Sequence, residues 1–213
     1  MAIKTKPYPA TLTINYPGKL NRWTTLFRLI LALPILVILA ILTASGGGEY
    51  TSKASQDMSQ SGGGIIAGLF VVTALMILFR QRYPRWWFDF NLELNRFYTR
   101  VEAYLLFLTD TYPSTVEQQS VHLDIKYPDV KKDLKRWMPL VKWFLALPHY
   151  VVLLILSLGA IFATILAWFA ILFTGRYPKD LFDFVVGVNR WSLRVSAYAF
   201  LLTTDQYPPF SLK

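Results

Sequence analysis

Long apolar stretches alternate with amphipathic ones along this chain. Residues 22–44 supply about 22 mostly apolar residues, close to the roughly 20 that a helix needs to cross the hydrocarbon of a bilayer. A shorter apolar run follows at residues 65–79, and residues 143–173 carry no formal charge. The pattern predicts helices that enter or cross a membrane.

Two amphipathic helices are predicted, over residues 86–108 and 180–202. Their charged residues recur at spacings of three and four, which places them on one helix face, opposite a face of aromatic and aliphatic side chains. We expect both helices to lie in the headgroup layer of the membrane. Their charged faces are expected to form structural ion pairs, which involve Asp89, Arg96, Arg100, Asp183, Arg190 and Arg194.

Two short segments have the alternation of a strand. Residues 11–15 and residues 121–125 alternate between apolar and polar side chains, and each is followed by a Tyr-Pro pair. Alternation with a period of two predicts a half-buried β-strand. We expect the two strands to pair with each other.

The second half of the chain repeats the first. The segment Leu-Ala-Leu-Pro at residues 31–34 recurs at 145–148, an offset of 114, whereas the motif Arg-Tyr-Pro at 82–84 recurs at 176–178, an offset of 94. The difference, 114 − 94 = 20, is about the length of a Gly/Ser-rich segment at 45–64. The chain therefore divides into a first repeat, 1–113, which carries an insertion, and a compact second repeat, 114–213.

Each repeat is expected to be a helical hairpin that crosses the membrane and returns. Insertions are tolerated at exposed tips, so the uncharged run 143–173 should break near Ser157 to Gly159, where the first copy has its loop. The predicted fold is an all-α membrane protein with four transmembrane helices in two tandem hairpin repeats, two interfacial helices and a small cytoplasmic β element. A shallower re-entrant hairpin is the alternative, because the returning arms are short.

Composition strengthens the membrane assignment. Hydrophobic residues make up 54% of the chain and charged residues only 16%, which is too apolar for a soluble surface. Every Lys and Arg except Lys53 lies outside the loop 45–64. By the positive-inside rule we expect a multi-pass protein with both termini in the cytoplasm.

The net charge of +9 is expected to meet anionic phospholipid and not nucleic acid. Its basic residues flank apolar runs beside Trp, as membrane anchors do, and no nucleic-acid-binding motif is present. Arg28 should extend along its helix and carry its guanidinium to the headgroups. The expected lipid-facing residues are Arg22, Trp23, Arg28, Arg82, Arg85, Trp86, Trp87, Arg136, Trp137, Lys142, Arg176 and Lys179.

No residue set in the sequence forms an active site. Cysteine is absent, which excludes thiolate chemistry, and His122 and His149 stand in no metal-binding or catalytic pattern. Asp89 and Asp183 occupy equivalent places and could relay protons or bind a cation, but arginines on the same helix face neutralise them. We expect no catalytic residue, metal or cofactor.

The combined motifs resemble a known family. They are Arg-Trp, Leu-Pro, Tyr-Pro, Phe-Asp-Phe, Asn-Arg and Arg-Val, closed by Thr-Asp-x-Tyr-Pro at 109–113 and 204–208. The arrangement resembles the bacterial membrane proteins of the domain-of-unknown-function 4389 family, over about residues 20–208. The resemblance implies a bacterial inner-membrane protein and carries over no catalytic residue.

The sequence favours a non-enzymatic accessory or scaffold subunit. Such a subunit would pack within a larger membrane complex or against itself and hold anionic lipid at the cytoplasmic interface. The alternative is a small transporter or channel with a pathway between the two repeats, although the spans lack the midplane charges that mark such pathways. An enzyme acting on lipid is a third class, for which Asp89 and Asp183 are the main candidates.

Overall fold

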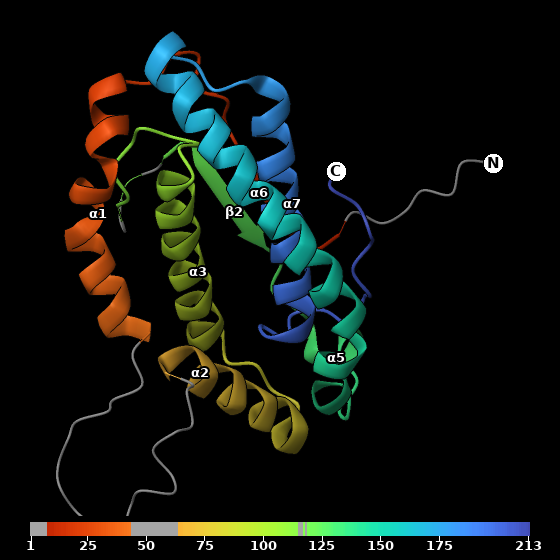
Figure 1. Cartoon of the computed structure of the whole chain (residues 1–213). Coiled ribbons are helices and arrows are strands. Elements are labelled where there is room, and N and C mark those ends of the chain that lie inside the picture. Colours follow the sequence, from red (N-terminus) through yellow and green to blue (C-terminus); the bar gives the residue numbers. More distant parts are fainter. Residues whose placement is uncertain (1–7, 44–63, 115–116, 118) are drawn as a thin grey trace, which may run out of the picture.

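The computed structural model describes residues 8–43, 64–114, 117 and 119–213. Within this part of the chain, helices dominate and one pair of strands is present (Figure 1). The predicted Gly/Ser loop lies outside the described residues, apart from Gly64, where a helix begins. The elements are β1 (Ala10–Ile14), α1 (Arg22–Thr43), α2 (Gly64–Leu75), the π-helix η1 (Met76–Arg80), α3 (Arg85–Leu105), β2 (Val121–Ile125), α4 (Val130–Asp133), α5 (Pro139–Leu145), α6 (Leu147–Thr174) and α7 (Lys179–Ala199).

Two of the described helices, α1 and α6, are long and apolar enough to cross a membrane. The apolar window of each is only 22% buried, whereas the core helix of a soluble protein is mostly buried. The Leu20 amide at the entrance of α1 donates to the Gly175 carbonyl after the end of α6, at 2.9 Å. The two helices therefore run in opposite directions with these ends together (Figure 1).

The prediction of a break near Ser157 to Gly159 is wrong. Helix α6 is continuous from Leu147 to Thr174, and a Cβ built on Gly159 would lie 3.4 Å from the ring of Phe184. This glycine therefore serves close helix packing and not a turn. An insertion in one copy shows where the chain tolerates a loop, but it does not require the other copy to turn there. The described chain thus has two candidate spans instead of the four predicted.

The predicted strands pair as expected. Strands β1 and β2 form an antiparallel ribbon in which Leu12 lies opposite Leu123. Alternate side chains of each strand are buried and the others are exposed, which is the period-two pattern of a sheet with one covered face.

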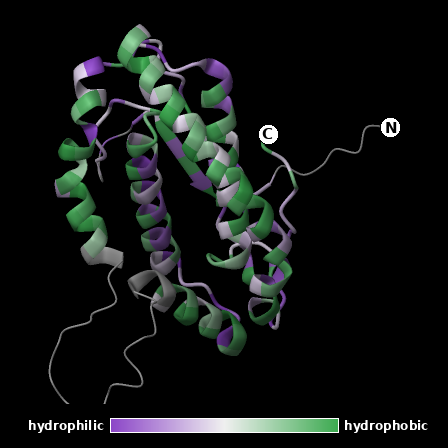
Figure 2. Cartoon of the chain, in the orientation of Figure 1, coloured by the Kyte–Doolittle hydropathy of each residue, from purple (hydrophilic) through white to green (hydrophobic). Residues whose placement is uncertain are grey.

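The helices and the ribbon form three layers. Helix α6 packs against α7, α7 packs against β1, and α3 packs against both α1 and β2. We call α1 and α6 the apolar layer, α3 and α7 the middle layer, and β1 with β2 the ribbon. Figure 2 shows the difference in character, with apolar residues dominating α1 and α6 and polar residues frequent on α3.

The middle helices lie close to their predicted bounds but not in the predicted surroundings. Helix α7 is mostly buried between α6 and the ribbon, so most of its surface cannot meet headgroups. Both helices end in a backbone reversal with a positive φ, at Phe107 and at Leu202. These reversals return the chain toward the starts of α1 and α5.

Candidate membrane interface

The apolar layer presents a large exposed hydrophobic surface. Monomeric soluble proteins seldom expose contiguous apolar patches of more than a few hundred Å², and larger ones mark protein or membrane contacts. Apart from Trp23, the most exposed apolar side chains of α1 and α6 are Leu29, Ile30, Leu33, Val37, Val151, Leu154, Ile155, Phe162, Leu166 and Phe173.

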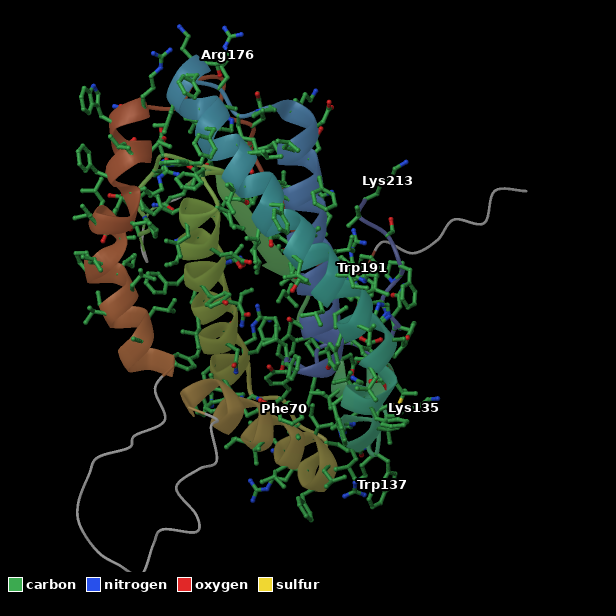
Figure 3. All side chains as sticks on the ribbon, in the orientation of Figure 1. Phe70, Lys135, Trp137, Arg176, Trp191 and Lys213 are labelled. Carbon is green, nitrogen blue, oxygen red and sulfur yellow. The ribbon has the colours of Figure 1, made fainter. Side chains whose placement is uncertain are left out.

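Aromatic and basic residues lie at both ends of this surface. Trp23 is 72% exposed at the start of α1, and Trp137 is 68% exposed just before α5. Figure 3 shows Arg176 beyond one end of α6, and Lys135 with Trp137 beyond the other. Exposed Trp and Arg at the ends of apolar helices are typical of anchors in the membrane interface.

Most of the predicted lipid-facing residues are accessible in this fold. The exposed ones are Arg22, Trp23, Arg82, Arg85, Trp86, Arg136, Trp137, Arg176 and Lys179. Trp87 is half-buried, and its indole N–H donates to the Thr73 hydroxyl at 2.8 Å. Arg136 donates to the carbonyls of Leu78 and Phe79, so its guanidinium also holds the end of η1.

Arg28 does not reach the headgroups. Its side chain is completely buried and forms an ion pair with Asp110. One guanidinium nitrogen donates to the carbonyls of Tyr104 and Thr109 at 2.9 and 3.0 Å, and the guanidinium lies 4.6 Å from the centre of the Tyr104 ring. The side chain fills a site inside the fold because the chain after α3 folds back over it.

Lys142 makes the corresponding contacts in the second half. It is 1% exposed, pairs with Asp205 at 2.7 Å and donates to the Thr204 carbonyl at 2.7 Å. Its ammonium lies 5.3 Å from the centre of the Tyr198 ring. Burial lowers the pKa of Lys142, and the pairing with Asp205 opposes this shift.

The two carboxylates also bind backbone. The second oxygen of Asp110 accepts from the Asn21 amide at 2.7 Å, and that of Asp205 accepts from the Lys135 amide at 2.6 Å. Each site therefore holds the entrance of an apolar segment to the end of a middle-layer helix. The sequence interpretation missed both carboxylates, although the repeated Thr-Asp-x-Tyr-Pro motif contained the signal.

The predicted ion pairs of the middle helices are largely replaced by contacts to backbone. Arg96 donates to the Leu123 carbonyl at 2.9 Å, and Arg190 donates to the Leu12 carbonyl at 3.1 Å. Arg96 also pairs with Glu93 and with Asp124 of β2. The two arginines thus clamp opposite strands of the ribbon at a pair of residues that face each other.

The remaining members of that set lie apart from one another. Asp89 pairs with Arg85 at 3.6 Å on the surface, and within the described residues Asp183 forms no ion pair. Arg100 donates to the Ser114 carbonyl, and Arg194 donates to the Ser211 and Lys213 carbonyls. These arginines stabilise the segments that follow their helices by donating to backbone carbonyls there.

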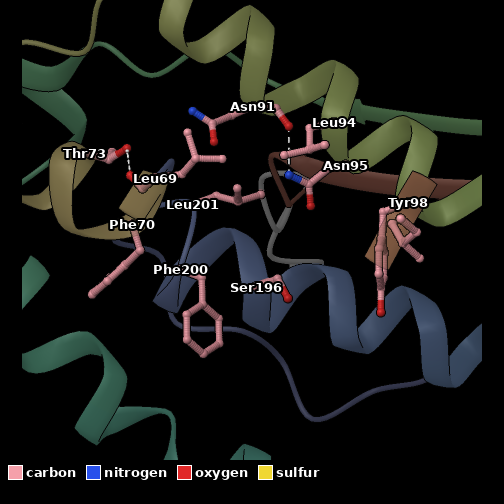
Figure 4. A pocket seen from close by; sticks show the side chains of 11 residues that line it. Leu69, Phe70, Thr73, Asn91, Leu94, Asn95, Tyr98, Ser196, Phe200 and Leu201 are labelled. Atoms are coloured by element: carbon pink, nitrogen blue, oxygen red, sulfur yellow. Dashed lines mark hydrogen bonds between the residues drawn. The ribbon is translucent and has the colours of Figure 1, made fainter. Parts of the chain in front are cut away.

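A cavity of about 200 Å³ lies between α2, α3 and α7 (Figure 4). Its wall is mainly apolar, and two of its polar side chains bond to their own helices: Thr73 donates to the Leu69 carbonyl, and the amide of Asn95 donates to the Asn91 carbonyl. One helical turn beyond Tyr98, burial raises the pKa of Glu102 to about 7.

No metal-binding cluster is present among the described residues. His149 is buried and accepts the indole N–H of Trp191 at 3.1 Å, which is a packing role. His122 lies on the exposed side of β2. Neither histidine joins a group of acids or other histidines in the described part of the chain.

These features define a mostly helical protein with two candidate membrane-spanning helices and a small antiparallel ribbon. Residues 136–211 match the model of a family described as "Domain of unknown function (DUF4389)". The matched segment contains α5, α6 and α7, and the resemblance predicted from the sequence motifs is confirmed over it. A search of curated proteins and a search of solved structures each gave no match.

Proposed function

We propose that this chain is a non-enzymatic accessory or scaffold subunit of a membrane protein complex, and that it binds anionic phospholipid. The observation that carries the proposal is the exposed apolar surface of α1 and α6, bounded at both ends by accessible Trp and Arg. Hydrocarbon covers such a surface at no cost, and anionic headgroups attract the basic residues around it.

The placement of the ionisable groups supports a role without catalysis. The buried cations Arg28 and Lys142 are both paired with a carboxylate and hydrogen-bonded to backbone. Such paired groups stabilise a fold and are unsuited to proton transfer or substrate binding. A transport pathway would need polar groups aimed into a passage, whereas Thr73 and Asn95 of the described cavity donate to carbonyls of their own helices.

The duplicated sequence motifs are part of the proposal. We propose that the two repeats are related by a pseudo-two-fold axis, so that each supplies one apolar segment, one middle-layer helix and one strand. The support is that corresponding residues make corresponding contacts: Arg28 with Asp110 and Lys142 with Asp205, and Arg96 on β2 and Arg190 on β1. In this proposal each repeat serves to pack helices and one strand together, and neither repeat supplies a reactive group.

Purification from native membranes in a mild detergent tests this function. We expect the chain to sediment with membranes after a carbonate wash, and to co-purify with a stoichiometric membrane protein and with an excess of phosphatidylglycerol over its share of the membrane. A soluble monomer without lipid would contradict the proposal.

A variant and its control test whether the basic residues are responsible for the binding of anionic lipid. Replacing the exposed basic residues in the triple variant Arg22→Gln, Arg176→Gln, Lys179→Gln should reduce the phosphatidylglycerol enrichment severalfold. The control variant Lys126→Gln removes a charge next to the ribbon, away from the apolar layer, and should leave the enrichment unchanged. Equal enrichment in both variants would show that the basic ends of the layer do not select lipid.

A further inference from the structure

We infer that α1 and α6 lie in the plane of the membrane, embedded in one leaflet of an anionic bilayer, and do not cross it. This inference rests on the proposed membrane association and specifies its geometry. It concerns one surface, the outer side of the apolar layer, and one occupant, a single lipid leaflet.

The first reason is that the three layers lie side by side along the length of the helices. Arg96 and Arg190, which stand near the middle of α3 and α7, bind the middle of the ribbon. Gly159, near the middle of α6, faces Phe184 of α7. The ribbon therefore lies level with the middle of α6, so helices that crossed the bilayer would carry the ribbon to its centre.

The ribbon is unsuited to that depth. Within the described residues, no further strand covers the two edges of the ribbon, and open sheet edges do not occur against hydrocarbon. The side chain of Asp124 on β2 is 77% exposed, and a carboxylate at the bilayer centre costs at least about 3 kcal/mol. Thr11, Thr13 and His122 add further exposed polar groups on the same face.

The second reason is the distribution of basic residues. Arg176 and Lys179 follow one end of α6, whereas Lys135 and Arg136 precede the other end (Figure 3). Helices that cross the membrane would place basic groups on both sides of it, against the positive-inside rule. Helices that lie flat place both groups on the cytoplasmic side, where the headgroups are anionic.

The third reason is the shape of the exposed surface on α6. Side chains at spacings of three and four form one stripe along the helix, made of Leu154, Leu158, Ile161, Ile165 and Phe169. The opposite side carries the small buried residues Ala160, Ala163 and Ala167, which let α6 pack closely within the fold. The exposed side chains of α6 therefore lie on one side of the helix, and this side can be immersed in a single leaflet while the other side stays packed against α7.

Accessibility to a membrane-impermeant maleimide tests the inference. The chain has no cysteine, so Lys135→Cys, Lys179→Cys and Thr13→Cys each introduce a single thiol at an exposed position: one near each end of α6 and one on the ribbon. We expect all three to react in sealed inside-out vesicles and none in spheroplasts. Reaction of Lys135→Cys and Lys179→Cys from opposite sides would overturn the inference.

Depth measurements provide a second readout that does not depend on the ends of the helix. Nitroxide labels on Leu154→Cys, Leu158→Cys, Ile161→Cys and Ile165→Cys, in vesicles of phosphatidylethanolamine and phosphatidylglycerol, should report one shared, shallow depth. A spanning helix would instead give depths that pass through the bilayer centre. Labels shielded from both lipid and water would show that a protein covers the stripe, which also overturns the inference.

The two proposals fail in distinguishable ways. A chain that stays in the supernatant when membranes are sedimented refutes the proposed membrane function. A chain that sediments with membranes but is labelled from both sides keeps that function and refutes only the in-plane geometry.

Discussion

At the scale of single residues, the two buried cation sites have the same geometry but different chemistry. Arg28 keeps its proton under all ordinary conditions, whereas Lys142 can release one when its environment favours the neutral form. Removal of one partner of a buried ion pair leaves an uncompensated charge, which costs about 3–5 kcal/mol. The two sites should therefore respond differently when their carboxylates are removed.

We predict that Asp110→Asn lowers the free energy of unfolding by about 3 kcal/mol throughout the range from about pH 6 to 10, in which the wild-type carboxylate is ionised. Asp205→Asn should cost a similar amount at neutral pH and less as the pH rises. Without Asp205, the pKa of folded Lys142 is held down by burial, so the destabilisation is lost as the pH rises from that lowered pKa toward the value of the unfolded chain. Thermal unfolding in detergent between pH 6 and 10 measures both effects.

The surface pair provides the control for these variants. Asp89 pairs with Arg85 where both side chains are more than half exposed, so Asp89→Asn should change the stability by less than about 1 kcal/mol. If Asp89→Asn and Asp110→Asn lowered the free energy of unfolding equally, the conclusion that buried Arg28 needs Asp110 as its counter-ion would be contradicted.

At the scale of elements, glycine marks where helices are packed most closely. A Cβ on Gly187 of α7 would lie 2.9 Å from both the Cβ and the carbonyl oxygen of Leu212 in the C-terminal segment. Gly68 of α2 has open space at the same position. The same substitution therefore tests a contact at one site and helix propensity alone at the other.

We predict that Gly187→Ala destabilises the protein by about 1–2 kcal/mol or displaces the C-terminal segment, because the steric cost exceeds the gain in helix propensity. Gly68→Ala should be neutral or stabilising by up to about 1 kcal/mol. Limited proteolysis at the C-terminus, with thermal unfolding of both variants, distinguishes the outcomes. A stabilised Gly187→Ala with an intact C-terminal segment would show that α7 and Leu212 do not pack as described.

The elements themselves were largely predictable, and their surroundings were not. Period-two alternation identified both strands, and three-to-four spacing identified α3 and α7 to within a few residues at each end. The prediction of a helix break at Ser157 was wrong because the Gly/Ser-rich segment at 45–64 contains no information on the backbone of residues 143–173. Arg28 was assigned to lipid because its partner Asp110 lies far away in the sequence, and periodicity does not report on such contacts.

At the scale of the whole molecule, the fold exchanges parts between its two halves. Strand β1 lies in the first half of the chain but packs against α7 of the second half, and β2 lies in the second half but packs against α3 of the first half. The Tyr16 hydroxyl donates to the Tyr177 carbonyl, and the Tyr127 hydroxyl donates to the Tyr83 carbonyl. Neither half can complete its own packing alone.

We therefore predict that residues 1–113 and 114–213, expressed as separate chains in one cell, associate and co-purify, and that either one alone aggregates or is degraded. Leu12→Lys, which places a charge on the buried side of β1, should abolish the association, whereas Thr13→Lys on the exposed side should preserve it. Independent, stable halves would contradict the exchange.

The two candidate membrane-spanning helices were predictable from composition and hydropathy, whereas the proposed relation of each helix to the bilayer was not. The hydropathy of residues 143–173 identifies an apolar helix but contains no information on whether a polar ribbon lies beside it. That neighbour is set by contacts between α6, α7 and β1, which are distant in sequence. Knowledge of the layers is therefore needed before length and hydropathy can be interpreted as a crossing.

The exchanged strands also impose an order on biosynthesis. Strand β1 emerges early from the ribosome, but α7, the helix against which it packs, is synthesised near the end of the chain. At 5–20 residues per second, the wait is on the order of ten seconds. During that interval β1 exposes an apolar side and two unpaired edges, which are open to pairing with other nascent chains. A chaperone that holds this strand, or early contact of α1 with the membrane, would protect the unfinished protein.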